Sequence, residues 1–257
     1  AEEEFGPEDV KTINAIFTAG YFWWDLGELE EAEPLMAEAV KRAKINLGET
    51  HQNTLVYSAT LAELYGYAGE GKKSIELYEK IIQPMQEVLG TDEESTLMAQ
   101  SMLGQLYLSV GRYKEAQALL VNALTSLTQI QADDTELGLL VKENLALAHK
   151  LQGSLDKSLE LYQAVLDFKQ ENFEADDPEI ILTSVNLAEV YRLKGMYQEA
   201  KPLFIQAVKF YAHLPEEEQG DMYSVLTNLA DLFLNTGEYK QAERLYQQIY
   251  NYEKKAF

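Results

Sequence analysis

Six glycines recur at a fixed spacing of 42 residues along the chain, without a single insertion or deletion between them. They are Gly27, Gly69, Gly111, Gly153, Gly195 and Gly237. A strict period of this length is typical of repeat architectures, in which each supersecondary unit packs against the next. We call these six residues the register glycines and count positions from them.

The positions that flank each register glycine repeat as well. Seven residues before it the chain always carries a small residue: Gly20, Ala62, Gly104, Ala146, Ala188 or Ala230. Five residues after it the residue is again small: Ala32, Ser74, Ala116, Ser158, Ala200 or Ala242. Small residues on both sides of a glycine turn let two antiparallel helices approach closely, and apolar residues recur at helical spacing without any strand-like alternation. We therefore predict an all-α chain of about twelve helices in six hairpins, stacked as a right-handed solenoid.

The sequence around the turns resembles the tetratricopeptide repeat (TPR). LGQLY (103–107) matches L-G-x-x-Y before the turn, and GRYKEA (111–116) matches G-x-Y-x-x-A after it. The 42-residue length and the phrase NLAEVYRLKGMYQEAKPLF (186–204) are similar to the kinesin light chain type of this repeat. The resemblance covers residues 8–253 and implies a right-handed superhelical TPR solenoid. We expect one array over residues 1–257, with repeats at approximately 7–48, 49–90, 91–132, 133–174, 175–216 and 217–257.

One stretch imitates a phosphate-binding loop. GYAGEGKKS (66–74) fits G-x-x-x-x-G-K-[ST] except at Lys73. Because Gly69 is a register glycine, we place this stretch at a turn between two helices and reject a nucleotide site. Gly71 replaces the Tyr or Leu of the other repeats, and Pro84 follows, so we expect a loose hairpin whose second helix is kinked or shortened.

Composition narrows the function classes. The formal net charge of −22, from 43 acidic and 21 basic residues, disfavours nucleic acids and anionic membrane surfaces as partners. The charge indicates either a well-solvated surface or a field suited to a basic partner. The absence of cysteine excludes disulfides and thiolate chemistry. With no apolar run of membrane-spanning length and no signal peptide pattern, we expect no membrane insertion and a cytoplasmic location. The first residue is not methionine, which leaves a removed presequence or a longer parent protein as alternatives.

Catalytic patterns are missing. The three histidines are far apart, and His149 occupies the position that is aromatic in the other repeats, four residues before the register glycine. We interpret His149 as a core residue. The pairs Asp133–Asp134 and Asp176–Asp177 begin repeats, where aspartate caps helix N-termini, so we prefer capping to metal binding. We expect no enzyme activity, no metal and no cofactor.

The helical period also predicts a binding face. Residues 13, 10, 9, 6, 3 and 2 places before each register glycine project away from the core, and in such solenoids they line the concave groove. We call this the groove face. In repeats 1–3 it carries mainly apolar residues: Phe17, Tyr21, Trp24, Val56, Tyr67, Met98, Met102 and Leu108. In repeats 4–6 it carries polar residues: Asn144, Asn186 and Asn228, spaced by 42, with Lys150, Glu189, Arg192 and Asp231 around them.

These residues are candidates for contact with a protein or peptide. Apolar groove residues can contact the apolar face of a peptide. Alternatively, they cover one another. An asparagine row can hold a peptide backbone, whereas its alternative role is to bond neighbouring helices. The resemblance implies peptide contact for Asn144, Asn186 and Asn228, since asparagines in this N-L-A context contact peptide in the kinesin light chain family. Related repeats that bind chaperones hold the C-terminal carboxylates of the chaperone with a set of lysines and asparagines, the dicarboxylate clamp. That set is absent here.

We therefore expect a non-catalytic protein- or peptide-binding scaffold that acts as an adaptor or assembly factor. The alternative is a peptide- or effector-sensing regulatory module of a larger signalling or transcription-regulating protein. The chain ends on the second helix of repeat 6 without a polar capping helix. We expect a covering segment, a second copy or a partner over the apolar residues there: Tyr246, Ile249, Tyr250 and Phe257.

Overall fold

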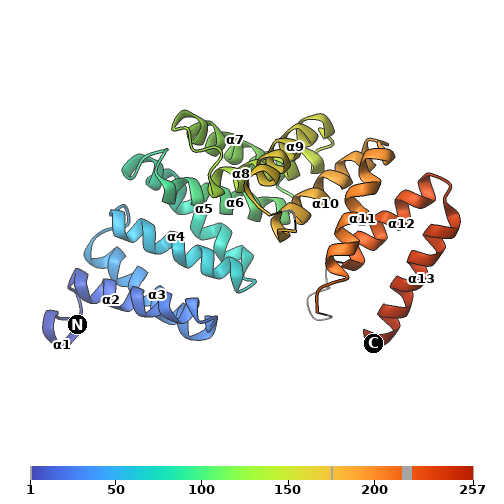
Figure 1. Ribbon diagram of the computed structural model, residues 1–257. Coiled ribbons are helices and arrows are strands. Elements are labelled where there is room, and N and C mark those ends of the chain that lie inside the picture. Colours follow the sequence, from blue (N-terminus) through green and yellow to red (C-terminus); the bar gives the residue numbers. More distant parts are fainter. Residues whose placement is uncertain (1, 175, 216–221, 257) are drawn as a thin grey trace. The chain divides into compact units, whose positions relative to one another are not determined.

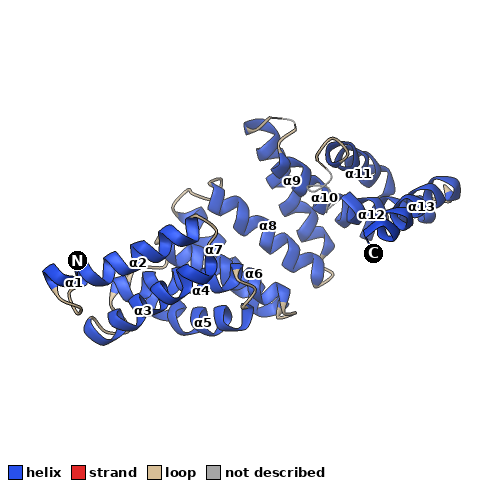
Figure 2. Ribbon diagram, turned by 90° about the horizontal axis from the view of Figure 1, so that it is seen from below, coloured by secondary structure: helices blue, strands red, loops and turns tan. Residues whose placement is uncertain are grey.

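The computed structural model describes residues 2–174, 176–215 and 222–256, and within these residues all regular structure is helical (Figure 2). The prediction of an all-α chain is therefore confirmed. The helices are α1 (Glu2–Phe5), α2 (Val10–Asp25), α3 (Leu29–Asn46), α4 (Gln52–Tyr67), α5 (Gly71–Val88), α6 (Glu94–Ser109), α7 (Tyr113–Gln129), α8 (Glu136–Leu151), α9 (Leu155–Asn172), α10 (Pro178–Leu193), α11 (Tyr197–Tyr211), α12 (Met222–Asn235) and α13 (Tyr239–Ala256). None of these described helices is long and apolar enough to cross a membrane.

The helices form two compact units, residues 1–144 and 145–257, and the division falls within α8. In the first unit, α2 packs on α3, α4 on α5 and α6 on α7, as the predicted hairpins require, and α3 and α5 each also contact the helix that follows (Figure 1). In the second unit, α10 pairs with α11 and α12 with α13, while α9 contacts α10 and α11 contacts α12. First helices of successive hairpins also touch, α4 with α6 and α10 with α12.

The register glycines end the first helix of each hairpin in the same way. All six adopt left-handed backbone, with φ between 76° and 82°. The residue after each glycine donates its backbone N–H to the carbonyl four residues before the glycine, at 2.8–3.0 Å in every repeat. This is the Schellman helix end, and it strongly favours glycine because a side chain at positive φ is strained. The 42-residue spacing is therefore the spacing of one repeated turn.

The small residues predicted beside the turn lie where the two helices touch. All ten alanines and serines at these positions are at most 2% exposed. A Cβ atom at Gly20 would lie 2.8 Å from Met36 Cγ and 3.1 Å from Met36 N, closer than packed atoms tolerate. In repeat 2 a hydrogen bond joins the two helices, because Ser74 Oγ donates to the Ala62 carbonyl at 2.5 Å. The predicted close approach is confirmed.

Each unit has its own apolar core. In the first unit, Ile13, Met36 and Val40 are buried together with Tyr57 and Leu61. In the second unit, one cluster gathers around Phe204 and Leu229, and another is built from residues of α8, α9 and α10.

The slot four residues before the register glycine is buried in repeat 4 and exposed in repeat 1. His149 is only 5% exposed, which confirms its interpretation as a core residue, and burial together with the nearby charge of Lys157 lowers its pKa. Trp23, which holds the same slot in repeat 1, is 38% exposed and makes an edge-on contact with Phe22. No preceding hairpin is described against α2, so the slot is not closed there.

Two other local expectations need correction. Asp177 does cap α10, accepting the Glu179 backbone N–H at 2.8 Å, but Asp133 and Asp134 cap no helix. They pair instead with Lys142, at 3.1 and 2.8 Å. Thr135 takes the capping place, since its Oγ1 accepts from the Gly138 backbone at 3.3 Å.

The second helix of the second hairpin is not shortened, contrary to one expectation from the sequence. Helix α5 runs for 18 residues, the same length as α3 and α9, although it contains Pro84. Gly71 is the first residue of α5 and the preceding element is helix α4, so the turn at Gly69 joins two helices as predicted. A phosphate-binding loop needs a strand before it, and the helical surroundings exclude that geometry here.

The close approach at Gly20 predicts opposite outcomes for two glycine substitutions. Gly20→Ala should destabilise the protein by about 1–3 kcal/mol, because the new methyl group overlaps Met36. Gly66→Ala should be neutral or stabilise by up to about 1 kcal/mol, because Gly66 lies in α4 and the nearest atom to its new methyl group, Ser74 Oγ, would be 3.6 Å away. Urea unfolding of both variants measures this, and a Gly20→Ala protein as stable as the wild type would contradict it.

The buried imidazole predicts a pH-dependent stability difference. Because its folded pKa is lowered, the unfolded chain takes up a proton at a higher pH than the folded chain. The stability that depends on neutral His149 is complete above the ordinary histidine pKa and is lost as pH falls through the folded pKa. His149→Phe, which installs the residue that repeat 6 carries at this slot, should therefore gain stability over the wild type as pH falls from about 8 to about 5. Thermal melts across this range measure the gain. His213→Phe, at an exposed histidine, is the control.

Candidate functional site

In the second unit, the predicted polar groove residues form a connected row. Lys150 Nζ on α8 donates to Glu189 Oε2 on α10 at 2.6 Å. Asn228 Nδ2 on α12 donates to Glu189 Oε1 at 3.0 Å. These residues are 39 positions apart in the sequence and stand three, six and nine places before successive register glycines. The repeat therefore brings together three of the predicted residues across three helices.

The remaining predicted residues of this unit differ in their partners. The hydroxyl of Tyr246 on α13 donates to Asp231 Oδ1, and this hydrogen bond raises the pKa of Tyr246 to about 12. Arg192 is half-buried, and its Nε has no hydrogen-bond partner among the described residues. Asn186 is half-buried on α10, the helix that carries Glu189.

In the first unit, the predicted aromatic residues partly cover one another. Trp24 contacts Tyr21 and Tyr67, with ring centroids 5.6 and 5.7 Å apart, and Phe17 stacks on Tyr57 at 4.2 Å. Tyr21 and Tyr67 nevertheless remain 51% and 68% exposed, whereas Trp24 is half-buried. Two aromatic faces thus stay accessible beside a packed tryptophan.

A hollow of about 570 Å³ opens beside Tyr67, and we call it the Glu63 hollow. It is lined by residues of α4, α5, α6 and α8: Glu63, Gly66, Tyr67, Ser74, Tyr78, Met102, Gln105, Leu106, Ser109 and Leu140. The predicted residue Met102 belongs to it. Glu63 was not among the predicted residues, although it stands six places before its register glycine, on the groove face.

The Glu63 carboxylate is unpaired in the described part of the chain. It makes no hydrogen bond or ion pair with any residue that the structure describes, and burial raises its pKa. Tyr78 lies nearby, fully buried, and burial and the charge of Glu63 together raise the pKa of the tyrosine. Glu63 is half-buried. A carboxylate partly withdrawn from water without a partner destabilises the folded state, which makes it a candidate functional group.

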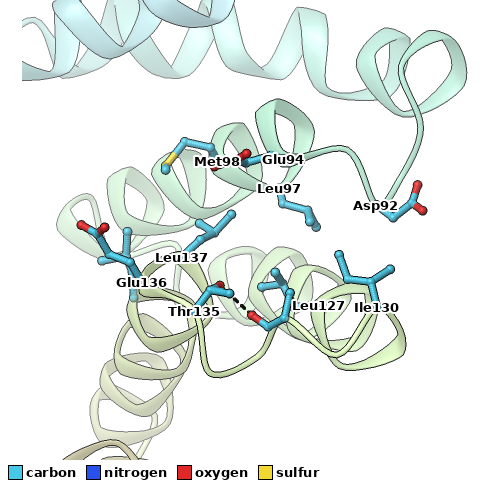
Figure 3. A pocket seen from close by; sticks show the side chains of 11 residues that line it. Asp92, Glu94, Leu97, Met98, Leu127, Ile130, Thr135, Glu136 and Leu137 are labelled. Atoms are coloured by element: carbon cyan, nitrogen blue, oxygen red, sulfur yellow. Dashed lines mark hydrogen bonds between the residues drawn. The ribbon is translucent and has the colours of Figure 1, made fainter. Parts of the chain in front are cut away.

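A second hollow, of about 390 Å³, lies where the first turn of α8 meets α6 and the end of α7 (Figure 3). Leu97 and Leu137 project into it, and the predicted residue Met98 also lines it. Asp92, at its rim in Figure 3, and Glu136 add acidic groups to an apolar lining. This hollow therefore suits an apolar side chain.

Two groove positions are more buried than expected. Leu108 is buried in the core and does not line an open surface, which corrects the sequence analysis. Asn144 is only 8% exposed, and its Nδ2 has no hydrogen-bond partner among the described residues. Asn144 Nδ2 and Arg192 Nε are the two side-chain nitrogens in the described part of the chain that are buried without a partner. Both stand on predicted groove positions.

The C-terminal helix leaves apolar area exposed. Tyr246 and Tyr250 are 38% and 58% exposed, whereas Ile249 packs partly against the core of the second unit. Phe257 lies outside the described residues. That a segment, a second copy or a partner covers this face stays a prediction.

The described residues contain no group of three or more histidines, aspartates or glutamates that could hold a metal ion. The candidate residues of the two units are amides, charged groups and residues that line apolar hollows. Such groups bind polypeptide by hydrogen bonds and burial.

Helical hairpins of this kind define a repeat scaffold, and comparison with protein families identifies the type. Profiles described as tetratricopeptide repeat match residues 19–53, 57–129, 101–173, 138–213 and 182–255. The chain belongs to the tetratricopeptide repeat family and is a protein-interaction scaffold. A comparison with curated proteins finds no significant match.

Solved structures share the fold at low sequence identity. A kinesin light chain protein from Podosopora anserina, with nearly identical TPR-like repeats, is 22% identical with a TM-score of 0.65, over 78% of this chain and 95% of that chain. BtubC (BKLC) from P. vanneervenii is 20% identical with a TM-score of 0.70, over 87% and 90% of the two chains. A Rap protein complexed with Competence and Sporulation Factor is 14% identical with a TM-score of 0.60, over 93% and 74%. The prediction of kinesin light chain-like repeats is thus confirmed for the fold.

The contrast between Glu63 and Glu189 predicts opposite effects of one substitution at equivalent positions. Glu189→Gln should destabilise the protein by about 1–3 kcal/mol, because the Lys150 ammonium loses its charged partner. Glu63→Gln should stabilise it at about pH 7, because an unpaired charge is removed, and this gain should shrink towards about pH 4 as the wild-type carboxyl is protonated. Urea unfolding at both pH values measures the two effects. Changes of the same sign in both variants would contradict this interpretation.

Proposed function

We propose that the chain is a non-catalytic scaffold that holds a peptide segment or a helix of a partner protein on its groove face. The observation that carries this proposal is the pair of buried, unpartnered N–H donors, Asn144 Nδ2 and Arg192 Nε. Leaving a buried donor unsatisfied costs about 1–3 kcal/mol, and most buried polar groups in native structures have a hydrogen-bond partner. A peptide carbonyl or carboxylate would satisfy each donor.

The asparagine row is suited to bind a peptide backbone. An amide side chain donates and accepts at once, as each peptide unit of a ligand does, so it can hold a backbone without regard to ligand sequence. Asn186 is half-buried and available for such contact, while Asn228 already donates to Glu189 and retains its carbonyl oxygen as an acceptor. Lys150, Glu189, Arg192 and Asp231 would then select ligands of mixed charge.

The first unit would add recognition of apolar side chains. Tyr21, Trp24 and Met102 would contact apolar ligand groups beside the Glu63 hollow, and Met98 would do so in the second hollow. Methionine and aromatic side chains adapt to varied apolar partners. A ligand with both apolar and polar stretches would suit these two kinds of surface.

An adaptor or an assembly factor needs only to bind its partner protein. We propose such a role for the chain, with its six repeats acting as one array in the cytoplasm. With a net charge of −22, nucleic acid is not a candidate ligand. The proposed activity is recognition of protein, without turnover of a substrate.

Peptide binding can be tested without knowing the natural partner. Peptides of about ten residues are selected on the intact chain from a random display library, synthesised, and titrated by fluorescence anisotropy. Changing Asn144, Asn186 and Asn228 together to Ala should weaken binding by about tenfold or more, through the loss of backbone hydrogen bonds.

The matched control removes three exposed asparagines from second helices, Asn46, Asn122 and Asn172. This control should bind like the wild type, and thermal melts should show that both triple variants are folded. Equal weakening in the two variants would refute the assignment of the asparagine row, and a library that yields no binder would refute the proposed function.

A further inference from the structure

Three repeats carry a carboxylate six places before the register glycine: Glu63, Glu189 and Asp231. Two of the three have partners in the structure. Glu189 accepts hydrogen bonds from Lys150 and Asn228, and Asp231 accepts one from the hydroxyl of Tyr246. Glu63 has no hydrogen bond or ion pair to any described residue, although it stands at the same place in its repeat.

Equivalent positions show why Glu63 is unpaired in the described part of the chain. Lys150 and Asn228 stand 39 residues before and after Glu189, and the corresponding neighbours of Glu63 are Trp24 and Met102. Neither can donate a charged hydrogen bond, and Met102 lines the Glu63 hollow. The lysine that pairs with Glu189 is thus replaced by a neutral tryptophan, and the asparagine that donates to Glu189 by a methionine without a donor.

The tyrosine that binds Asp231 also has a counterpart beside Glu63. Tyr78 follows Glu63 by 15 residues, as Tyr246 follows Asp231. Tyr78 is 2% exposed and makes no hydrogen bond to Glu63 among the described contacts, whereas the hydroxyl of Tyr246 reaches Asp231. The fold therefore offers Glu63 none of the partners that it offers the two equivalent carboxylates.

The space in front of Glu63 has the volume and lining for a long cationic side chain. The Glu63 hollow measures about 570 Å³, and among the described residues that line it Glu63 is the one acidic group. Met102 and Leu106 provide apolar walls for a methylene stem. Exposed Tyr67, whose ring contacts Trp24, provides an aromatic face on which a cation can rest.

We propose that the Glu63 hollow binds a lysine or arginine side chain of the bound peptide, with Glu63 pairing the cation. This inference rests on the proposed function and adds a specificity to it. The Lys150–Glu189 ion pair shows the same pairing within the chain, because the ligand would supply to Glu63 a cation like the one that Lys150 on α8 supplies to Glu189. The strongly acidic chain would also attract basic peptides over longer distances. A divalent metal ion is a poor occupant, because it needs several oxygen ligands and the lining offers one carboxylate.

The test compares ligand and protein variants in a double-mutant cycle. Peptides of about ten residues are selected from a random display library on the intact wild-type chain and synthesised with acetylated N-termini, so that the cation comes only from a side chain. We expect the binders to share one Lys or Arg position. Changing that residue to Met should weaken binding to the wild type by about tenfold, and binding to Glu63→Gln by less than about twofold.

Glu87→Gln is the matched control, since Glu87 is exposed on α5 and accepts a hydrogen bond from Gln83. It should respond to the peptide change as the wild type does. Binders without a shared basic position would overturn the inference, and so would equal losses in Glu63→Gln and the wild type. If such binders still depend on Asn144, Asn186 and Asn228, the proposed function stands and only the basic subsite is refuted. A library without any binder would overturn both proposals.

Discussion

Two helices that touch at small side chains on either side of a left-handed glycine form the unit of this structure. The glycine fixes where the first helix ends, and the buried alanines, serines and glycines fix how closely the second helix returns. Because neither contact tolerates an extra residue, the register glycines keep a spacing of 42 residues and each first helix presents the same positions. The groove face is a product of that fixed spacing, since residues 39 apart meet only when the helices stay in register.

Much of the fold could be predicted because its determinants are local. A register glycine, a small residue seven places before it and one five places after it lie within one hairpin, and their spacing alone indicates which helices pair. The aromatic slot shows the limit of such reasoning. His149 is buried as its position predicts, whereas Trp23 at the same position is exposed, because closure of the slot depends on a neighbouring hairpin. The turn before α8 shows the same limit, since Asp133 and Asp134 pair with Lys142 and leave the cap to Thr135.

The candidate site could be predicted only in outline. Periodicity placed Lys150, Glu189 and Asn228 on one face, but their hydrogen bonds depend on side-chain geometry across three helices. Glu63 was missed because its significance lies in partners that are absent. A carboxylate on a groove position attracts attention only after its neighbours in the repeats before and after are known to be Trp24 and Met102. Comparing each groove residue with those 39 positions before and after it would have revealed the missing partners of Glu63 from the sequence. The hollow beside Glu63 could come only from the structure.

The row of Lys150, Glu189 and Asn228 also limits how modular this repeat array is. Each hairpin has its own turn and its own helix contact, so a single repeat looks like a part that could be exchanged. Yet exchanging the hairpin of α10 and α11 would remove Glu189, and with it the partner of a lysine on α8 and of an asparagine on α12. The smallest segment that can be transplanted with its polar contacts intact is therefore three consecutive repeats. Recombination between repeats, in nature or in the laboratory, would preserve the fold more readily than this row of polar contacts.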